Sequence, residues 1–236
     1  MQEKLTALVE RLKPAFGERL ASVILYGSAA AGDYYEHSSD LNILCVLSEL
    51  TPHELSQSEP VFRWWRQQGN PPPLLLSEEE VRSSTDSFPM EFHDMQEHRR
   101  VLLGRDVIAE LAIDRSFYRA QVEHELRAKV IRLRQKAAEL LGNSERLTKL
   151  MVDSISTFCV LGRHALILSG NPPKWKKKEI VESLEDAMRM GLGATNEILA
   201  IRSDPKRKAP SDAAVLFADY LKEMTALVGF VDKLDR

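Results

Sequence analysis

A Gly-Ser pair, Gly27 and Ser28, ends an apolar run of residues 23–26 and has the residue types of a phosphate-binding turn. Because glycine has no Cβ, a phosphate or another backbone can approach it closely. A helix that begins after Ser28 would direct its free N–H groups toward an anion. The segment 33–39 that follows is polar, and its Tyr34 and Tyr35 are either base-stacking residues or ordinary loop residues.

Eleven residues separate Ser28 from an acid, Asp40, which together with the amide Asn42 stands at the start of a second apolar run, residues 41–47. On a strand, successive side chains point to opposite faces, so Asp40 and Asn42 share one face while Leu41 and Ile43 point into the core. Oxygen ligands of this kind suit a hard cation such as Mg²⁺. Asparagine offers an amide oxygen but brings no charge. The pattern predicts two short strands that place a phosphate-friendly turn beside a metal-binding edge.

This arrangement resembles the signature of the DNA polymerase β-like nucleotidyltransferase superfamily. That signature is an apolar residue and Gly-Ser, then, about a dozen residues later, Asp, an apolar residue and a second acid. Gly27, Ser28, Asp40 and Leu41 match it, whereas Asn42 replaces the second acid. The turn at residues 29–32 also lacks the arginine that often precedes its glycine.

The resemblance implies transfer of a nucleotide monophosphate from a nucleoside triphosphate such as ATP to a hydroxyl acceptor, with Mg²⁺ as metal. Such chemistry uses two cations roughly 3.5–4 Å apart. Gly27 and Ser28 would bind phosphates, and Asp40 and Asn42 would be catalytic metal ligands. The family takes a third acid from a later strand. Residues 87–95 alternate like a strand, so Glu91 is the expected third ligand or general base, and the alternative is an exposed glutamate on an edge strand.

Further elements follow from periodicity in the first half of the chain. Residues 2–16 and 52–68 have the apolar spacing of amphipathic helices. Residues 73–76 are expected to form a short strand. Ser77 then precedes three glutamates, which is typical of a helix N-cap with acids at the positive helix end.

Beyond residue 113 the composition changes and helical stripes replace strand patterns. The predicted fold class is therefore α+β, with a small mixed-sheet nucleotidyltransferase domain over residues 1–112 and a C-terminal all-α helical bundle domain over 113–236, as in kanamycin nucleotidyltransferase-like proteins. Helices are expected at 116–141, 147–169, 180–190 and 194–202, with a last one starting at Asp212. Two basic groups, one along residues 119–136 and one at 174–178, are either solvated surfaces or anion contacts.

Composition limits the function classes. The 236 residues carry a formal net charge of −3, with 44% hydrophobic and 28% charged residues, which disfavours a general nucleic-acid binder. The two cysteines lie in apolar runs and are expected to be free thiols in a reducing compartment. No signal-peptide pattern and no uncharged apolar run of roughly 18 residues occurs, so a cytoplasmic location without a membrane partner is expected.

Two functions remain open at this point. The first is the transferase, acting on a small-molecule nucleotide and an acceptor that the sequence does not identify. The second is a catalytically degenerate form of the fold, with a nucleotide-binding, regulatory or antitoxin-like role. A homodimer or a partner protein is compatible with either function. The charge lost at Asn42 is the main argument for the second.

Overall fold

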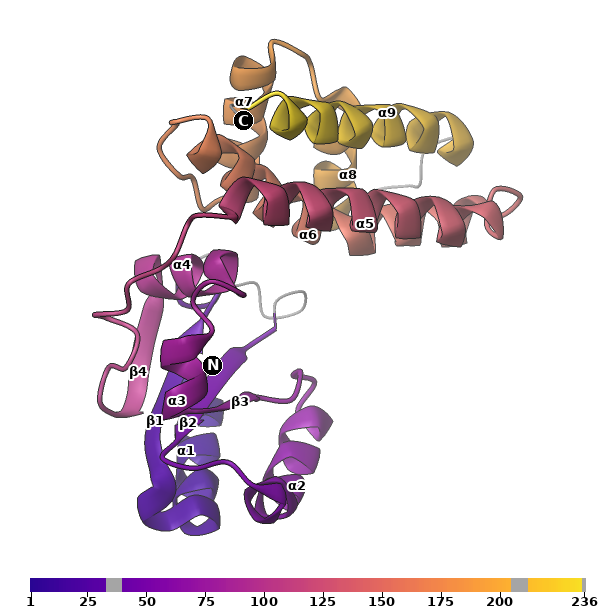
Figure 1. Ribbon diagram of the computed structural model, residues 1–236. Helices are drawn as coiled ribbons and strands as arrows, with labels where there is room; N and C mark the ends of the chain where they lie inside the picture. Colours follow the sequence, from indigo (N-terminus) through magenta and orange to yellow (C-terminus); the bar gives the residue numbers. More distant parts are fainter. Residues whose placement is uncertain (33–39, 205–211, 235–236) are drawn as a thin grey trace. The chain divides into compact units, whose positions relative to one another are not determined.

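The computed structural model describes residues 1–32, 40–204 and 212–234 (Figure 1). The chain divides into two compact units, Met1–Ser116 and Phe117–Arg236. The first contains a four-stranded sheet and the second is helical, so the predicted fold class is confirmed. The boundary predicted from the sequence lies four residues earlier, between residues 112 and 113.

The first unit is built on a mixed sheet with the strand order β3-β2-β1-β4. β1 pairs antiparallel with both β2 and β4, and β2 pairs parallel with β3. The strands are β1 (Leu20–Tyr26), β2 (Asn42–Leu47), β3 (Leu74–Ser77) and β4 (Arg99–Gly104). The helices are α1 (Gln2–Phe16), the 3₁₀ turn η1 (Gly17–Arg19), α2 (Pro52–Gln67), α3 (Glu78–Ser83) and α4 (Pro89–Glu97).

Both faces of this sheet are covered by helices. Successive residues of β1 point to opposite faces: Val23 and Leu25 pack with α1 and α2, and Ile24 packs with α3 and α4. β2 divides in the same way, with Ile43 in the first cluster and Leu44 in the second. Residues 22–25 of β1 and 43–47 of β2 are buried, as expected of central strands covered on both sides.

The strand predicted over residues 87–95 is wrong, because residues 87 and 88 lie in a turn and helix α4 begins at Pro89. Proline is well suited to the first position of a helix, where its fixed φ fits and no amide donor is needed. Pro89 occupies that position, and the buried residues Phe92, His93 and Met95 follow at helical spacing. The apolar residues on either side of Glu91 belong to this helix, and Glu91 itself is exposed.

Two helix starts in this unit are capped by side chains, and the cap at Ser77 is the one that the sequence predicts. Ser77 caps α3, accepting a hydrogen bond from the Glu80 amide while the Glu80 carboxylate accepts one from the Ser77 amide. Thr51 and Glu54 form the same capping box at α2. Each box satisfies backbone donors that the first helical turn leaves without partners.

The second unit is a bundle around α6. Among residues 117–204 and 212–234 no strand occurs, which agrees with the sequence pattern. The helices are α5 (Tyr118–Ala138), α6 (Ser144–Leu168), α7 (Lys177–Met188), α8 (Gly193–Ser203) and α9 (Ala213–Asp232). α6 contacts each of the other four. By length and composition it is apolar enough to cross a membrane, and 56% of that apolar window is buried inside the structure. Its packing in the bundle accounts for this composition.

Candidate functional site

The Gly-Ser turn and the Asp-x-Asn segment meet where β1 ends and β2 begins. Tyr26, the last residue of β1, pairs with Asn42, the first residue of β2. Gly27 follows with a φ of +76°, a conformation that residues with a side chain rarely adopt. A Cβ at Gly27 would lie only 3.0 Å from Nδ2 of Asn42. The Asn42 side chain therefore lies directly against Gly27, as the sequence pattern requires of one site.

The backbone after Gly27 folds into a tight turn. The Gly27 carbonyl accepts hydrogen bonds from the amides of Ala30 and Ala31, each at 3.0 Å. Ala29 is buried in the core, and Ser28 is half-buried. Residues 29–32 are turn, so the helix expected to begin after Ser28 does not begin within them. Tyr34 and Tyr35 lie outside the described residues.

The predicted alternation at β2 is confirmed on its apolar side. Leu41 and Ile43 are 0% and 1% exposed and belong to the cluster with α1 and α2. Leu44 and Tyr26 pack on the opposite face, with α3 and α4. By alternation Asn42 shares that opposite face, and Asp40, which precedes the strand, is exposed.

Glu91 lies near the same end of the sheet, although it is not on a strand. Burial raises the pKa of the Tyr26 hydroxyl, and the negative charge of Glu91 raises that pKa further. The Glu91 carboxylate is thus within electrostatic range of the residue that pairs with Asn42. The helix α4 packs on the face that carries Tyr26, which explains how a helical residue reaches this region.

The strand beside β2 supplies no carboxylate. β3 pairs with β2 from Leu44 onward and has the sequence Leu-Leu-Leu-Ser over residues 74–77. The acids that follow begin at Glu78 and belong to α3. A third acid on a neighbouring strand, which the family pattern implies, is therefore absent from the described sheet.

The structure reveals a further residue at this site, Asn70, which no sequence pattern singles out. Asn70 lies between α2 and β3 and is 7% exposed. Its Oδ1 accepts a hydrogen bond from the backbone amide of Leu41 at 3.3 Å. Leu41 stands between Asp40 and Asn42, so this bond attaches the candidate site to a distant loop. A Gly-Asn-Pro-Pro sequence signals a turn but carries no information about this partner.

The basic groups of the helical unit are paired to a large extent. On α5, Glu123 accepts hydrogen bonds from both Arg119 and Arg127, and Lys129 pairs with Glu125 at 3.4 Å. Neutralisation within the helix favours the interpretation of this row as a solvated helix face.

The lysine-rich segment at 174–178 is held in a similar way. Lys176 and Lys178 each face a glutamate three or four residues later, at 3.5 and 3.8 Å. Trp175 lies under the guanidinium of the buried Arg163, 4.2 Å from its ring centre. A cation–π contact of this kind anchors the segment to α6.

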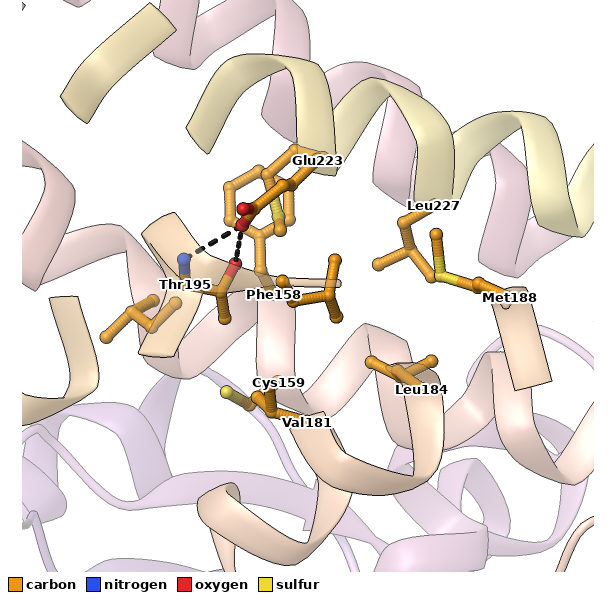
Figure 2. Close-up of a pocket in the computed structure, with 11 residues that line it drawn as sticks. Phe158, Cys159, Val181, Leu184, Met188, Thr195, Glu223 and Leu227 are labelled. Atoms are coloured by element: carbon orange, nitrogen blue, oxygen red, sulfur yellow. Dashed lines mark hydrogen bonds between the residues drawn. The ribbon is translucent and has the colours of Figure 1, made fainter. Parts of the chain in front are cut away.

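A small pocket lies inside the helical unit, among α6, α7, α8 and α9 (Figure 2). It is lined by Ile155, Phe158, Cys159, Val181, Leu184, Met188, Leu192, Thr195, Glu223, Met224 and Leu227. The Glu223 carboxylate accepts hydrogen bonds from the amide and hydroxyl of Thr195, at 2.8 and 2.6 Å, and from the Ala194 amide at 2.8 Å. Its charge is thus used to cap α8, the Thr195 hydroxyl is bound to it, and the remaining lining residues are apolar, which does not suit a phosphate-bearing ligand.

Comparison with solved structures supports the fold. The chain is similar to the crystal structure of spectinomycin adenyltransferase AAD(9) from Enterococcus faecialis with ATP and spectinomycin. The TM-score is 0.65 and the sequence identity 15%, over 99% of this chain and 100% of the other. No protein-family model and no curated protein matches the chain. This likeness shows that the chain shares its fold with that adenyltransferase.

Proposed function

We propose that the protein is a nucleotidyltransferase that moves a nucleoside monophosphate from a triphosphate such as ATP to a hydroxyl group of a small acceptor. The observation that carries this proposal is the contact between Gly27 and Asn42, which joins the Gly-Ser turn to the Asp40 segment. The neighbour that shares the fold was solved with ATP and spectinomycin, and this supports a nucleotide and a small acceptor as ligands.

The residues at this end of the sheet divide into two roles. Gly27 lets the turn lie close against the Asn42 side chain, and the Ser28 hydroxyl beside it can donate to a phosphate. Asp40 and Asn42 offer the hard oxygen ligands that fit Mg²⁺. Bound there, the ion would neutralise charge on the phosphates. Because Asn42 is neutral, the segment supplies one negative charge where two aspartates would supply two.

Glu91 is the candidate for the general base, since its charge acts on Tyr26 beside Asn42. In the proposed step the acceptor oxygen bonds to the α-phosphorus of the triphosphate. The bond from that phosphorus to the bridging oxygen breaks, and pyrophosphate leaves. The proton of the acceptor hydroxyl passes to the Glu91 carboxylate. The role of third metal ligand is not assigned to Glu91, because the strand on which it rested is a helix.

The experiment that tests this proposal is a calorimetric titration of Mg²⁺–ATP into the wild type, Asp40→Ala and Asn42→Asp. Asp40→Ala should abolish metal-dependent binding, because it removes the only charge of the segment. Asn42→Asp should strengthen that binding. It should also raise any transferase rate by roughly 10²–10³, the factor that one group stabilising charge in a transition state commonly contributes. Glu59→Ala, which removes an exposed carboxylate from α2, is the control and should bind as the wild type does.

A labelled-nucleotide assay then identifies the acceptor. The protein is incubated with α-labelled ATP, Mg²⁺ and pools of small hydroxyl compounds that include spectinomycin. Label found in a product of the acceptor supports the transferase. If the wild type binds no Mg²⁺–ATP, or if Asp40→Ala binds it as well as Glu59→Ala does, the proposed function is wrong.

The second candidate function is a catalytically degenerate nucleotide-binding or regulatory protein. A specific observation favours it: β3 carries Leu-Leu-Leu-Ser beside β2, and Asn42 is neutral, so Asp40 is the single acid of the segment. Nucleotide binding that needs no metal, without label transfer to any acceptor, supports this function over the first.

A further inference from the structure

Asn70 lies in a short stretch whose backbone conformation is restricted. α2 ends at Gln67, Gly69 follows with a φ of +84°, and three consecutive prolines, residues 71–73, lead into β3. A residue that precedes proline is restricted to extended conformations, and each proline fixes its own φ. The backbone of Asn70 is thus held from both sides by the local sequence.

The side chain of Asn70 extends the sheet by one hydrogen bond. β3 begins to pair with β2 only at Leu44, three residues after Leu41. Before that point, Oδ1 of Asn70 accepts the Leu41 amide, as a strand carbonyl would. Leu41 is fully buried, so its amide would otherwise be a buried donor in need of a partner.

The two ends of this amide are used unequally. Oδ1 must face the Leu41 amide because only the oxygen can accept a hydrogen bond. Nδ2 is buried and has no hydrogen-bond partner among residues 1–32, 40–204 and 212–234. Within the described residues, the Asn70 side chain therefore makes its hydrogen bond through the acceptor oxygen Oδ1.

We propose that Asn70 is a positioning residue that holds Asp40 and Asn42 in place through the backbone of Leu41. The role of these two residues in metal and nucleotide binding rests on the proposed function. The effect of Asn70 is indirect, since it contacts the residue between them. Removing the acceptor frees the Leu41 amide and loosens the two ligand-bearing residues on either side of it.

The chain contains its own matched control. The sequence Gly-Asn-Pro-Pro occurs at residues 69–72 and again at 170–173, in each case after a helix and with the glycine at positive φ. Asn171 is exposed, and its Nδ2 donates to Ser169 two residues before it. Asn171→Ala thus makes the same change in the same local sequence, away from Leu41.

The test compares Asn70→Ala, Asn70→Leu, Asn70→Asp and Asn171→Ala with the wild type. Amide hydrogen exchange at Leu41, read by NMR without nucleotide, should be about fivefold faster in the Ala and Leu variants of Asn70, as loss of one ordinary hydrogen bond implies. Asn70→Asp keeps the acceptor, so its Leu41 exchange should stay near the wild-type rate, as should that of Asn171→Ala. Mg²⁺–ATP affinity should fall about tenfold in Asn70→Ala and Asn70→Leu.

The outcomes separate this proposal from the proposed function. Unchanged Leu41 exchange in Asn70→Leu, which fills the volume without an acceptor, overturns the proposal. So does faster exchange with unchanged Mg²⁺–ATP affinity. If the wild type binds no Mg²⁺–ATP, the proposed function fails, and the Leu41 exchange alone decides whether Asn70 holds this segment.

Discussion

Replacing Glu223 by glutamine should destabilise the helical unit strongly, although the two side chains have nearly the same shape. Both carboxylate oxygens of Glu223 accept from backbone donors, one from Ala194 and the other from Thr195. Figure 2 shows the bonds between Glu223 and Thr195. In glutamine one of these oxygens becomes an NH₂ group. Whichever way the amide is turned, a donor then faces a backbone donor at the start of α8.

The magnitude follows from these contacts. A buried donor left without its partner costs about 1–3 kcal/mol. The lost negative charge had also favoured the positive end of α8, a term of up to about 2 kcal/mol in partly buried geometries. Glu223 is 6% exposed, so water cannot readily replace the lost acceptor. The expected loss in the free energy of unfolding is about 2–4 kcal/mol.

Differential scanning calorimetry and urea unfolding followed by far-UV circular dichroism measure this loss. A decrease of about 3 kcal/mol in a unit of this size corresponds to a Tm lower by roughly 10 °C. The control is Glu182→Gln, the same change at an exposed glutamate that pairs with Lys178 at 3.8 Å, which should shift the Tm very little. Equal Tm values for the Glu223 and Glu182 variants would refute the assignment of Glu223 as the cap of α8.

Two further predictions concern the sheet unit. Gly104→Ala should lower the free energy of unfolding of this unit by more than about 3 kcal/mol, measured by urea unfolding. The reason is that φ at Gly104 is +75° and the new Cβ would lie 2.0 Å from the Ala21 carbonyl oxygen. An unchanged urea midpoint would contradict this geometry. The pKa of Glu54 is lowered to about 2, and the largest cause is the hydrogen bond that its carboxylate accepts from the Thr51 hydroxyl. The ionised Glu54 side chain therefore contributes its full stabilisation above about pH 4.5, and this contribution is lost as the pH falls toward 2. Glu54→Gln should therefore reduce the decline in stability between pH 5 and pH 3, and an identical decline in wild type and variant would show that Glu54 is not responsible.

The spacing of apolar residues in the sequence predicts the fold correctly where burial follows a single period, two for a strand or about 3.6 for a helix. The alternation through Leu41 and Ile43 predicted which face of β2 is buried, because a strand covered on both sides must still send neighbours in opposite directions. The helical spacing from Tyr118 onward predicted an all-helical second half for the same reason. In both cases local spacing and tertiary burial agree.

The segment around Glu91 shows where this reasoning fails. Met90 and Phe92 alternate with Glu91, which satisfies a strand pattern over three residues, yet a helix places buried residues at Pro89, Phe92 and His93 just as well. Nine residues are too few for the two periods to be separated by apolar positions alone. Pro89 was the available signal, since a proline fits the first turn of a helix and interrupts a central strand.

The two Gly-Asn-Pro-Pro turns show that the local sequence does not determine whether a turn residue is buried. They share four residues and a glycine at positive φ, but Asn70 is buried against Leu41 while Asn171 is exposed. The difference comes from what lies beside each turn. After α2 the chain must return to the edge of β2, where a backbone amide needs an acceptor, whereas the turn after α6 ends next to its own helix. A sequence predicts the conformation of such a turn, and the sheet around it determines whether its asparagine has a partner.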